Sequence, residues 1–287
     1  MSNLNSPEEV AKYTLETGIK KAKMAPFQTF LLSILAGAFI GFAAYGATAA
    51  SHDISSYGLA KLVSAIVFGT GLMMVIIGGA ELFTGNTLLV IAWREGKITL
   101  RQMLRNWSLV YSGNFIGAIL MVSLLAFAGV WGNNGGLVGG ATIKIAAYKT
   151  SYQFFQVVLL GILCNWLVCM AVWMSYSAKD VAGKILAVFF PIMLFIVSGF
   201  EHAIANMYFI PAGILAASNP ELVALSGLGA EKLGYLTWKG FFLNNLIPAT
   251  IGNIIGGALA VGVVYWLVYV KGTQKAKPVS LAKEKVA

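Results

Sequence analysis

The chain has 287 residues, of which 58% are hydrophobic and only 11% are charged. Soluble domains carry about 25% charged residues, so a soluble protein is excluded and most of the surface must face lipid. The net charge of +9 would suit a nucleic-acid-binding protein, but its distribution along the chain argues against that partner, as described below.

The chain begins with a polar segment, residues 1–25, that contains four lysines and three glutamates. We expect a short amphipathic helix lying on the membrane surface, on the cytoplasmic side. The segment has no apolar stretch of the kind found in cleavable signal peptides. Residues 26–271 are expected to form a channel domain, and the basic tail, residues 272–287, is expected to be disordered and cytoplasmic.

Six apolar segments follow the N-terminal segment, each near or above the length of about 20 residues that spans a bilayer. The second and fifth are too long for one straight helix and contain polar residues, so we interpret them as broken helices. The predicted spans are residues 26–50, 58–93, 106–131, 154–178, 182–217 and 241–270.

The lysines and arginines between these segments predict the topology. Most of them precede the first segment, follow the sixth, or lie between the second and third and between the fourth and fifth. The positive-inside rule therefore places both termini in the cytoplasm. We expect the protein to lie in the cytoplasmic (inner) membrane. Because these basic residues act as topology signals without interleaved aromatics, nucleic acid is not an expected partner.

The polar residues of the second segment recur 120 positions later in the fifth. Gly79, Glu81 and Asn86 return as Gly199, Glu201 and Asn206. Segments one and four match at an offset of 128, and segments three and six match at an offset of 139. Three spans is an odd number, so the second copy must enter the bilayer from the opposite side. The sequence thus predicts an all-α membrane protein with six transmembrane helices in an inverted 3+3 repeat, with its site near the midplane.

Two helix starts facing the midplane would form an anion site, because free amides at a helix start bind anions. Thr84 and Asn206 can add side-chain donors there, and His202 can donate a hydrogen bond or a proton. The alternatives are a Thr84 hydroxyl bonded to its own helix, asparagines that join helices, and a satisfied buried histidine. We favour the joining role for Asn86 and the site role for Asn206.

The glutamates and the histidine are interpreted differently. Glu81 and Glu201 would repel an anion, so we expect each to accept hydrogen bonds from freed amides at its helix break. His202 corresponds to Leu82 in the other copy, and a residue needed in one copy only is more readily explained by function. Cys164 and Cys169 are interpreted as small buried hydrophobes, and neither a metal-ligand cluster nor a cofactor motif occurs.

Four stretches of the chain resemble the formate/nitrite transporter family. They are GGAELFTGN, CNWLVCMAVWMSYS, SGFEHAIANMYFIPAG and NLIPATIGNIIGG, and the similarity extends over all six segments. The resemblance implies a homopentamer of aquaporin-like protomers, each with its own pore for small anions.

The resemblance also assigns residues. It places the substrate pathway at His202, Thr84, Asn206, Lys149 and Glu201, with Lys149 in the outward vestibule. It places apolar constrictions at Phe68, Leu72 and Phe195 toward the outside, and at Leu82, Phe83 and Val168 toward the cytoplasm. The residues alone would indicate only that these six apolar side chains belong to the core.

The predicted function is a channel for small monovalent weak-acid anions, most of all formate. Sequence markers of nitrite and hydrosulfide members occur beside those of formate members, so nitrite, hydrosulfide and lactate remain alternative substrates. A proton-coupled formate carrier would use the same residues. An aquaporin-type channel would show paired Asn-Pro-Ala tripeptides, which are missing from the sequence. An enzyme is not expected, because one histidine beside one glutamate is a weak catalytic signal.

Overall fold

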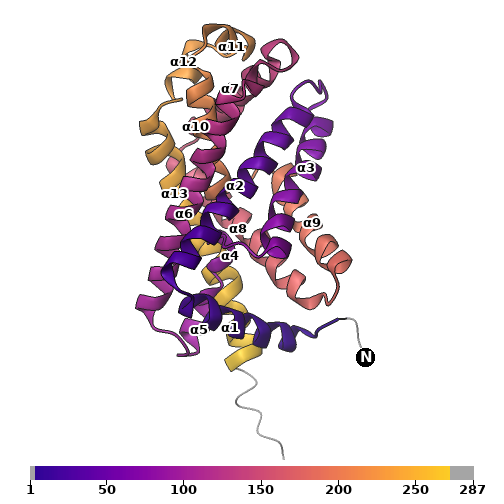
Figure 1. The fold of residues 1–287 in the computed structure, drawn as a ribbon, viewed down its shortest axis with the longest axis vertical. Helices are drawn as coiled ribbons and strands as arrows, with labels where there is room; N and C mark the ends of the chain where they lie inside the picture. Colours follow the sequence, from indigo (N-terminus) through magenta and orange to yellow (C-terminus); the bar gives the residue numbers. More distant parts are fainter. Residues whose placement is uncertain (1–3, 272–287) are drawn as a thin grey trace, which may run out of the picture.

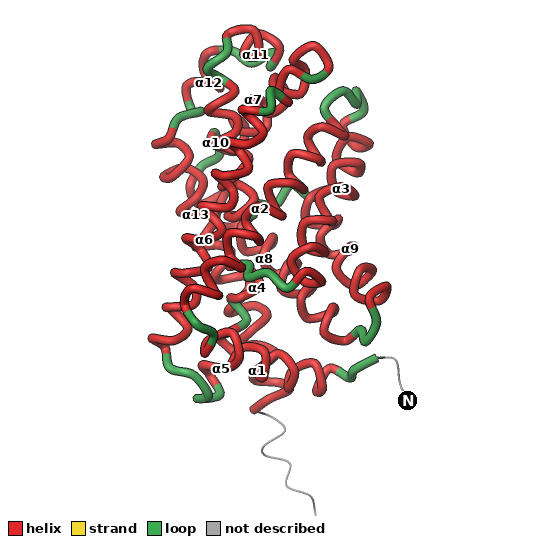
Figure 2. Tube along the Cα trace, viewed as in Figure 1, coloured by secondary structure: helices red, strands yellow, loops and turns green. Residues whose placement is uncertain are grey.

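The protein is an elongated bundle of helices in a computed structural model that describes residues 4–271 (Figures 1 and 2). Helix α1, Pro7–Lys23, crosses one end of the bundle, and α7, Leu137–Thr150, lies toward the other. We call these the α1 end and the α7 end. Within the described residues, the only strand-like pairing is one isolated bridge between Leu4 and Ala178.

Five helices are long and apolar enough to cross a membrane. Four of them lie at the first, third, fourth and sixth predicted segments, and the remaining one lies at the first half of the second segment. Their bounds differ from the prediction by a few residues. They are α2 (Pro26–Ser51), α3 (Tyr57–Gly78), α6 (Leu100–Phe127), α8 (Phe154–Ser177) and the continuous helix Gly240–Lys271. The last comprises η3 (Gly240–Leu246), α13 (Ile247–Ile254), η4 (Ile255–Val263) and η5 (Trp266–Lys271).

The second and fifth apolar segments each contain more than one helix. After α3 ends at Gly78, α4 spans Phe83–Asn86 and α5 spans Leu89–Arg94. In the fifth segment α9 spans Val181–Val197 and α10 spans Ala203–Ala216. Gly79 and Gly199 follow the first helix of each segment with φ of +81° and +72°. Glycine adopts this left-handed conformation at low cost, and it commonly ends helices.

Helix α1 has local signals for both of its ends. Ser6 and Glu9 form a capping box at its start, and basic residues occupy its last turn. The buried positions Val10, Ala11, Thr14, Gly18 and Ala22 recur at helical spacing. This face packs against α5, where a Cβ added to Gly18 would lie 3.2 Å from the Cβ of Ala92. The first helix is therefore docked on the bundle along one face.

Helix α7 lies between the third and fourth predicted segments, where the sequence analysis predicted no element. It has 14 residues, which is too short to span a bilayer. Its position follows from the repeat, because residues 137–150 correspond to residues 9–22 of α1 at the offset of 128. The remaining connections contain η1 (Val130–Gly132), η2 (Asn134–Gly136), α11 (Pro220–Leu225) and α12 (Ala230–Gly234).

Glycines allow the long helices to pack with their backbones in contact. A Cβ added to Gly117 of α6 would clash with the Ile34 carbonyl of α2. A Cβ added to Gly256 would clash in the same way with the Ile162 carbonyl of α8. Small residues at such crossings are typical of membrane helices, where association depends on close packing. These two contacts lie at equivalent positions of the two copies.

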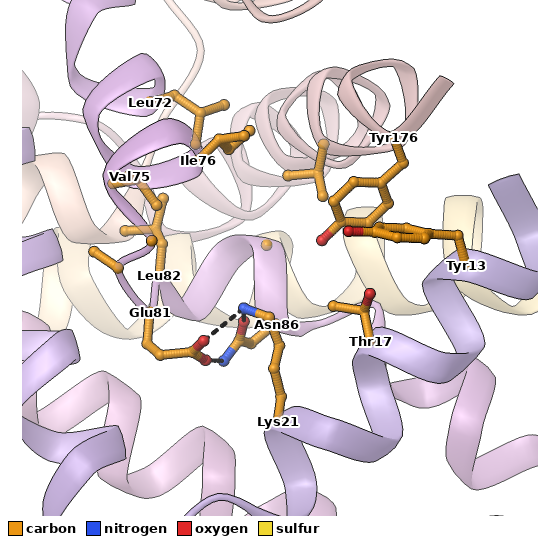
Figure 3. A pocket seen from close by; sticks show the side chains of 14 residues that line it. Tyr13, Thr17, Lys21, Leu72, Val75, Ile76, Glu81, Leu82, Asn86 and Tyr176 are labelled. Atoms are coloured by element: carbon orange, nitrogen blue, oxygen red, sulfur yellow. Dashed lines mark hydrogen bonds and ion pairs between the residues drawn. The ribbon is translucent and has the colours of Figure 1, made fainter. Parts of the chain in front are cut away.

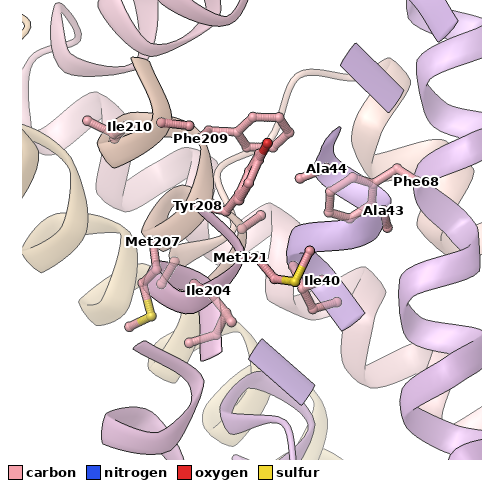
Figure 4. Packing of buried hydrophobic residues seen from close by; sticks show 14 of the residues in the cluster. Ile40, Ala43, Ala44, Phe68, Met121, Ile204, Met207, Tyr208, Phe209 and Ile210 are labelled. Atoms are coloured by element: carbon pink, nitrogen blue, oxygen red, sulfur yellow. The ribbon is translucent and has the colours of Figure 1, made fainter. Parts of the chain in front are cut away.

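The bundle has an apolar interior and an apolar exterior. Aromatic and aliphatic side chains fill the interior between α2, α3, α6 and α10, among them Phe68, Tyr208 and Phe209 (Figure 4). On the outside, large apolar side chains such as Phe27 (72% exposed) and Phe127 (91% exposed) have no cover within one chain. Lipid tails or neighbouring subunits must cover such a surface.

Candidate functional site

His202 lies at the interruption between α9 and α10, inside the bundle. His202 is buried, with 3% of its surface exposed. The ring of Phe195 stacks beside it with centroids 5.9 Å apart and planes 25° apart. Nε2 of His202 lies 3.0 Å from Oγ1 of Thr84, which belongs to the interruption of the other copy. The two interruptions therefore meet at one buried histidine–threonine pair.

The backbone of α10 determines which nitrogen of His202 carries a proton. Nδ1 accepts a hydrogen bond of 3.0 Å from the Ala205 amide, so the ring acts as the N-cap of α10. An amide can only donate, so Nδ1 must be unprotonated in this geometry. The neutral ring then carries its proton on Nε2, and this proton points toward Thr84. A doubly protonated ring would place two donors against each other and would lose the cap.

Thr84 is held in position from its backbone side. Nδ2 of Asn165 on α8 donates to the Thr84 carbonyl at 3.3 Å and to Oγ1 of Thr87 at 3.2 Å. The Thr84 hydroxyl bonds to His202 and not to a carbonyl of its own helix, which was the alternative considered from the sequence. With Nε2 of His202 as the donor, the hydroxyl proton of Thr84 is left for a further acceptor.

A charged cluster surrounds the interruption at the α7 end. Nζ of Lys149, at the end of α7, lies 2.8 Å from Oε1 of Glu201. Oε2 of Glu201 accepts from Nδ2 of Asn206 at 2.6 Å and from Nδ2 of Asn245 at 2.9 Å. The same nitrogen of Asn206 also donates to Oδ1 of Asn245 at 2.6 Å. The structure thus brings Lys149, Glu201 and Asn206 together in one hydrogen-bonded cluster.

An equivalent cluster surrounds the interruption at the α1 end (Figure 3). Nζ of Lys21, on α1, lies 2.9 Å from Oε1 of Glu81. Nδ2 of Asn86 donates to Oε2 of Glu81 at 2.7 Å and to Oδ1 of Asn106 at 2.9 Å. The sequence analysis did not identify Lys21. The signal that could have found it was the repeat itself, because Lys21 and Lys149 are 128 residues apart, the offset of segments one and four.

The two asparagines differ in one contact, and otherwise have the same role. Oδ1 of Asn86 accepts from Nζ of Lys21 at 2.8 Å, whereas the buried Oδ1 of Asn206 has no hydrogen-bond partner among the described residues. Both amides join a glutamate to an asparagine of a neighbouring helix. The assignment of this joining role to Asn86 alone was therefore too narrow, since Asn206 has it as well.

The expected partners of the two glutamates were wrong. No freed backbone amide among the described residues bonds to the carboxylate of Glu81 or Glu201; a lysine and asparagine side chains do. The reason is charge. A buried carboxylate is costly unless it is paired, and an ammonium supplies both charge and donors.

Two other asparagines satisfy the freed backbone groups. Oδ1 of Asn253 accepts from the Ala203 amide at 2.9 Å, and its Nδ2 donates to the carbonyls of Gly161 and Glu201, both at 2.9 Å. Asn114 makes the corresponding bonds in the other interruption. Its Oδ1 accepts from the Phe83 amide at 2.9 Å, and its Nδ2 donates to the carbonyls of Ser33 at 2.8 Å and Glu81 at 2.9 Å. These two side chains therefore pair the backbone groups that each interruption leaves free.

A cavity of about 210 Å³ lies beneath α1, between α1, α3 and α8 (Figure 3). Lys21, Glu81 and Leu82 line it, together with Tyr13 and Tyr176, whose rings pack edge to face with centroids 4.9 Å apart. Leu72 lines this cavity as well. Leu72 thus shares this cavity with Leu82, and it also belongs to the same buried cluster as Phe68 and Phe195, with which the sequence analysis grouped it.

The other predicted constriction residues are buried. Phe68 and Phe195 meet edge to face, with centroids 5.9 Å apart, and Phe68 stacks with Phe209 at 6.2 Å. Phe83 contacts the rings of Trp107 and Tyr111 on α6. Leu82 and Val168 are 3% and 1% exposed. Apolar side chains thus flank the His202–Thr84 pair on both sides.

Metal chemistry finds no support in the described part of the chain. Residues 4–271 contain no group of three or more histidine, cysteine, aspartate or glutamate side chains that could hold a metal ion. Both Cys164 and Cys169 are buried free thiols.

Comparisons with known proteins agree on one relationship. The model of the family described as formate/nitrite transporter matches residues 8–267. The chain is 42% identical over 269 residues to formate channel FocA of Escherichia coli (strain K12), covering 92% of this chain and 94% of that protein. It is 43% identical over 262 residues to formate channel FocA of Haemophilus influenzae, covering 90% and 92%.

Solved structures show the same similarity. The fold matches a structure titled "Pentameric formate channel with formate bound" with a TM-score of 0.79 and 39% identity, over 87% of this chain and 98% of that one. A second match, titled "FNT family ion channel", has a TM-score of 0.75 and 26% identity, over 90% of this chain and 98% of that one.

Proposed function

The chain belongs to the formate/nitrite transporter family, and from this premise we propose that it is a channel for small monovalent weak-acid anions, with formate as the main substrate. The observation that carries the proposal is the buried His202–Thr84 pair. It provides polar hydrogens at the point where apolar side chains would otherwise close the interior. Formate is the ligand named for the structural relative and in the names of the sequence relatives.

The pair addresses the main energetic obstacle to an anion in this interior. An unpaired charge loses its hydration there at a cost of many kcal/mol. A carboxylate that reaches the pair can accept a hydrogen bond from Nε2 of His202 or from the hydroxyl of Thr84. Desolvation also raises the pKa of the carboxylate, which favours its neutral acid. Either effect lowers the barrier between the apolar side chains on the two sides.

The hydrogen bond that caps α10 determines whether His202 can only hydrogen-bond the anion or can also give it a proton. With Nδ1 accepting from Ala205, the ring has a single proton and can only hydrogen-bond the anion. Giving up that proton would create an imidazolate. Transfer of a proton to formate therefore requires a second state, in which Nδ1 is protonated and the cap is released. We infer that the capped ring is the resting state, and that proton transfer proceeds through the uncapped one.

We propose that the membrane domain is a six-span inverted 3+3 repeat with aquaporin-like protomers and two interrupted spans. The equivalent clusters of Lys21 and Lys149 support this architecture and extend each copy by one surface helix, α1 or α7. A further contact supports the two-fold relation. Tyr111 and Thr250 are 139 residues apart, the offset of segments three and six, and their hydroxyls bond each other at 2.8 Å. Equivalent residues can meet only close to a two-fold axis.

We further propose a homopentamer in the cytoplasmic membrane, with one pathway in each protomer and both termini in the cytoplasm. The exposed apolar side chains support burial in lipid and against neighbouring subunits. The distribution of lysines and arginines supports the orientation. In this orientation the α1 end faces the cytoplasm and the α7 end faces outward. Residues 1–25 remain a proposed cytoplasmic segment, and the basic tail, residues 272–287, lies outside the described residues.

A flux assay with purified protein in vesicles tests the function. Formate, nitrite, hydrosulfide, lactate and chloride are compared at several pH values, with protein-free vesicles as the control. We expect formate to be the fastest and chloride to be excluded, because chloride cannot form a neutral acid at these pH values. Formate flux no faster than in protein-free vesicles would refute the proposal. Uphill formate uptake driven by a pH gradient would identify the alternative, a proton-coupled carrier.

The role of Thr84 gives a second test. Thr84→Val removes the hydroxyl and keeps the shape of the side chain, so Nε2 of His202 loses its partner. The loss of one hydrogen bond costs about 1 kcal/mol, which corresponds to about a fivefold decrease in formate flux. Thr84→Ser keeps the hydroxyl and should retain most of the flux. Equal flux through the valine and serine variants would show that the hydroxyl is not used.

A further inference from the structure

We propose that Lys61 supplies the unpaired positive charge that draws anions into the mouth at the α7 end, in addition to the paired lysine Lys149. The inference rests on the proposed function, because it assigns a role in anion entry. It concerns a residue for which neither the sequence motifs nor the resemblance suggested a role.

The position of Lys61 on α3 directs its side chain toward the predicted pathway. Lys61, Ala65, Phe68 and Leu72 are spaced by four, three and four residues, so they lie on one face of the helix. Ala65, Phe68 and Leu72 on this face are 0%, 2% and 3% exposed. Lys61 therefore lies at the start of this inward face, two helical turns before Phe68.

The contacts of Lys61 place it beside the interruption at the α7 end. Its Nζ lies 3.8 Å from the point that a Cβ on Gly199 would occupy. The same nitrogen lies 5.8 Å from the centroid of the Tyr57 ring, a cation–π contact. Lys61 also interacts electrostatically with both Glu201 and Lys149. The ammonium group is thus close to the charged cluster but is not bonded to it.

The two lysines flank the aromatic side chains at this end. Nζ of Lys149 lies 5.5 Å from the centroid of the Phe209 ring. Phe209 stacks with Phe68, which is on the helix face of Lys61 (Figure 4). An anion that approaches Phe68 from the α7 end would therefore come close to both ammonium groups.

Within the group formed by Lys61, Lys149 and Glu201, Lys61 leaves one positive charge unmatched. The charge of Lys149 is matched by Glu201 at 2.8 Å. Lys61 has no ion pair or hydrogen bond within residues 4–271, and its recorded contacts are those with Tyr57 and the electrostatic interactions above. These two ammonium groups and one carboxylate together carry a net charge of about +1, and a charge of one sign raises the local concentration of counter-ions.

The repeat shows that this charge is present in one copy only. The position 120 residues after Lys61 is Val181, an apolar residue that is 58% exposed. The lysine–glutamate pairs of the two ends are equivalent, so Lys61 distinguishes them. Anion entry from the α7 end should depend on Lys61, and entry from the α1 end should not.

Single-channel recording in planar bilayers tests this inference, with formate on one side at a time and an impermeant salt to set the ionic strength. At low ionic strength, Lys61→Met should lower the formate current from one side by about three- to tenfold, within the range of steering effects. At high ionic strength the currents of the variant and the wild type should converge, because salt screens the charge.

Three comparisons make the result decisive. Lys61→Arg keeps the charge and should retain the current and its salt dependence. Lys144→Met, which removes an exposed lysine of α7, should leave both unchanged. A Lys61→Met current that is reduced equally at every ionic strength, or equally from both sides, would indicate a structural role and overturn the inference. An inactive wild-type protein would instead refute the proposed function, so the two failures are distinguishable.

Discussion

Replacing His202 with asparagine is expected to flatten the pH dependence of formate flux while leaving the protein folded. An unperturbed histidine titrates between about pH 5 and 8, and asparagine does not titrate. Asparagine is also a favourable N-cap residue, so it can replace Nδ1 as the acceptor for the Ala205 amide. The variant therefore separates the titration of residue 202 from its structural role in capping α10.

The measurement is formate flux in vesicles from pH 5 to pH 8, together with the preference for formate over chloride. In the wild type the uncapped, doubly protonated ring becomes more populated as the pH falls, so flux by proton transfer should rise. His202→Asn should show a flatter profile and a weaker selectivity for weak acids. His202→Ala should show the same change together with lower stability, because it also loses the cap. An unaltered pH profile and selectivity in the asparagine variant would rule out the proton-transfer role.

Replacing Asn253 with leucine is expected to cause the largest loss of stability. Its side chain pairs the Ala203 amide and the carbonyls of Gly161 and Glu201, and it is fully buried. Each buried polar group left without a partner costs about 1–3 kcal/mol, so the total is several kcal/mol. Water cannot reach these groups to replace the lost bonds. The oligomer should therefore dissociate or unfold at a distinctly lower temperature than the wild type, as measured by thermal unfolding in detergent.

Two matched variants control this experiment. Asn114→Leu removes the same three kinds of bond from the other copy and should cost a similar amount. Asn244→Leu is adjacent to the second cluster but removes a single bond, to the Thr150 carbonyl at 3.2 Å, and should cost much less. An Asn253→Leu protein with the thermal stability of Asn244→Leu would show that these bonds do not hold the interruption.

Much of the membrane domain could be predicted from the sequence because its signals are local. Long apolar segments in a bilayer form helices, because each backbone N–H and C=O group must find a hydrogen-bond partner within its own segment. The glycines that end α3 and α9 are recognisable because few other residues adopt a positive φ. His202 and Thr84 of the proposed site could be singled out because polar side chains are conspicuous in apolar segments.

The partners of the site residues could not be predicted in the same way. The glutamates were expected to bond to their own helix breaks, and the structure instead pairs Glu81 with Lys21 and Glu201 with Lys149. On the sequence, Lys21 is one of several lysines in a polar helix, where most lysines are solvated. Only the docking of α1 on the bundle brings this lysine to a carboxylate 60 residues away along the chain.

The sequence by itself determined that the chain is a helical membrane protein and where its apolar helices lie, and its spacing predicted a repeat of two halves. These properties depend on hydrophobicity, segment length and spacing along the chain. The tertiary structure decided that α7 is a helix, that Leu72 and Leu82 line one cavity, which tautomer of His202 fits the cap, and that Lys61 lacks an ion-pair partner within residues 4–271. Each of these depends on distances between side chains of different helices, because pairing, tautomer and net charge are set by neighbours in space.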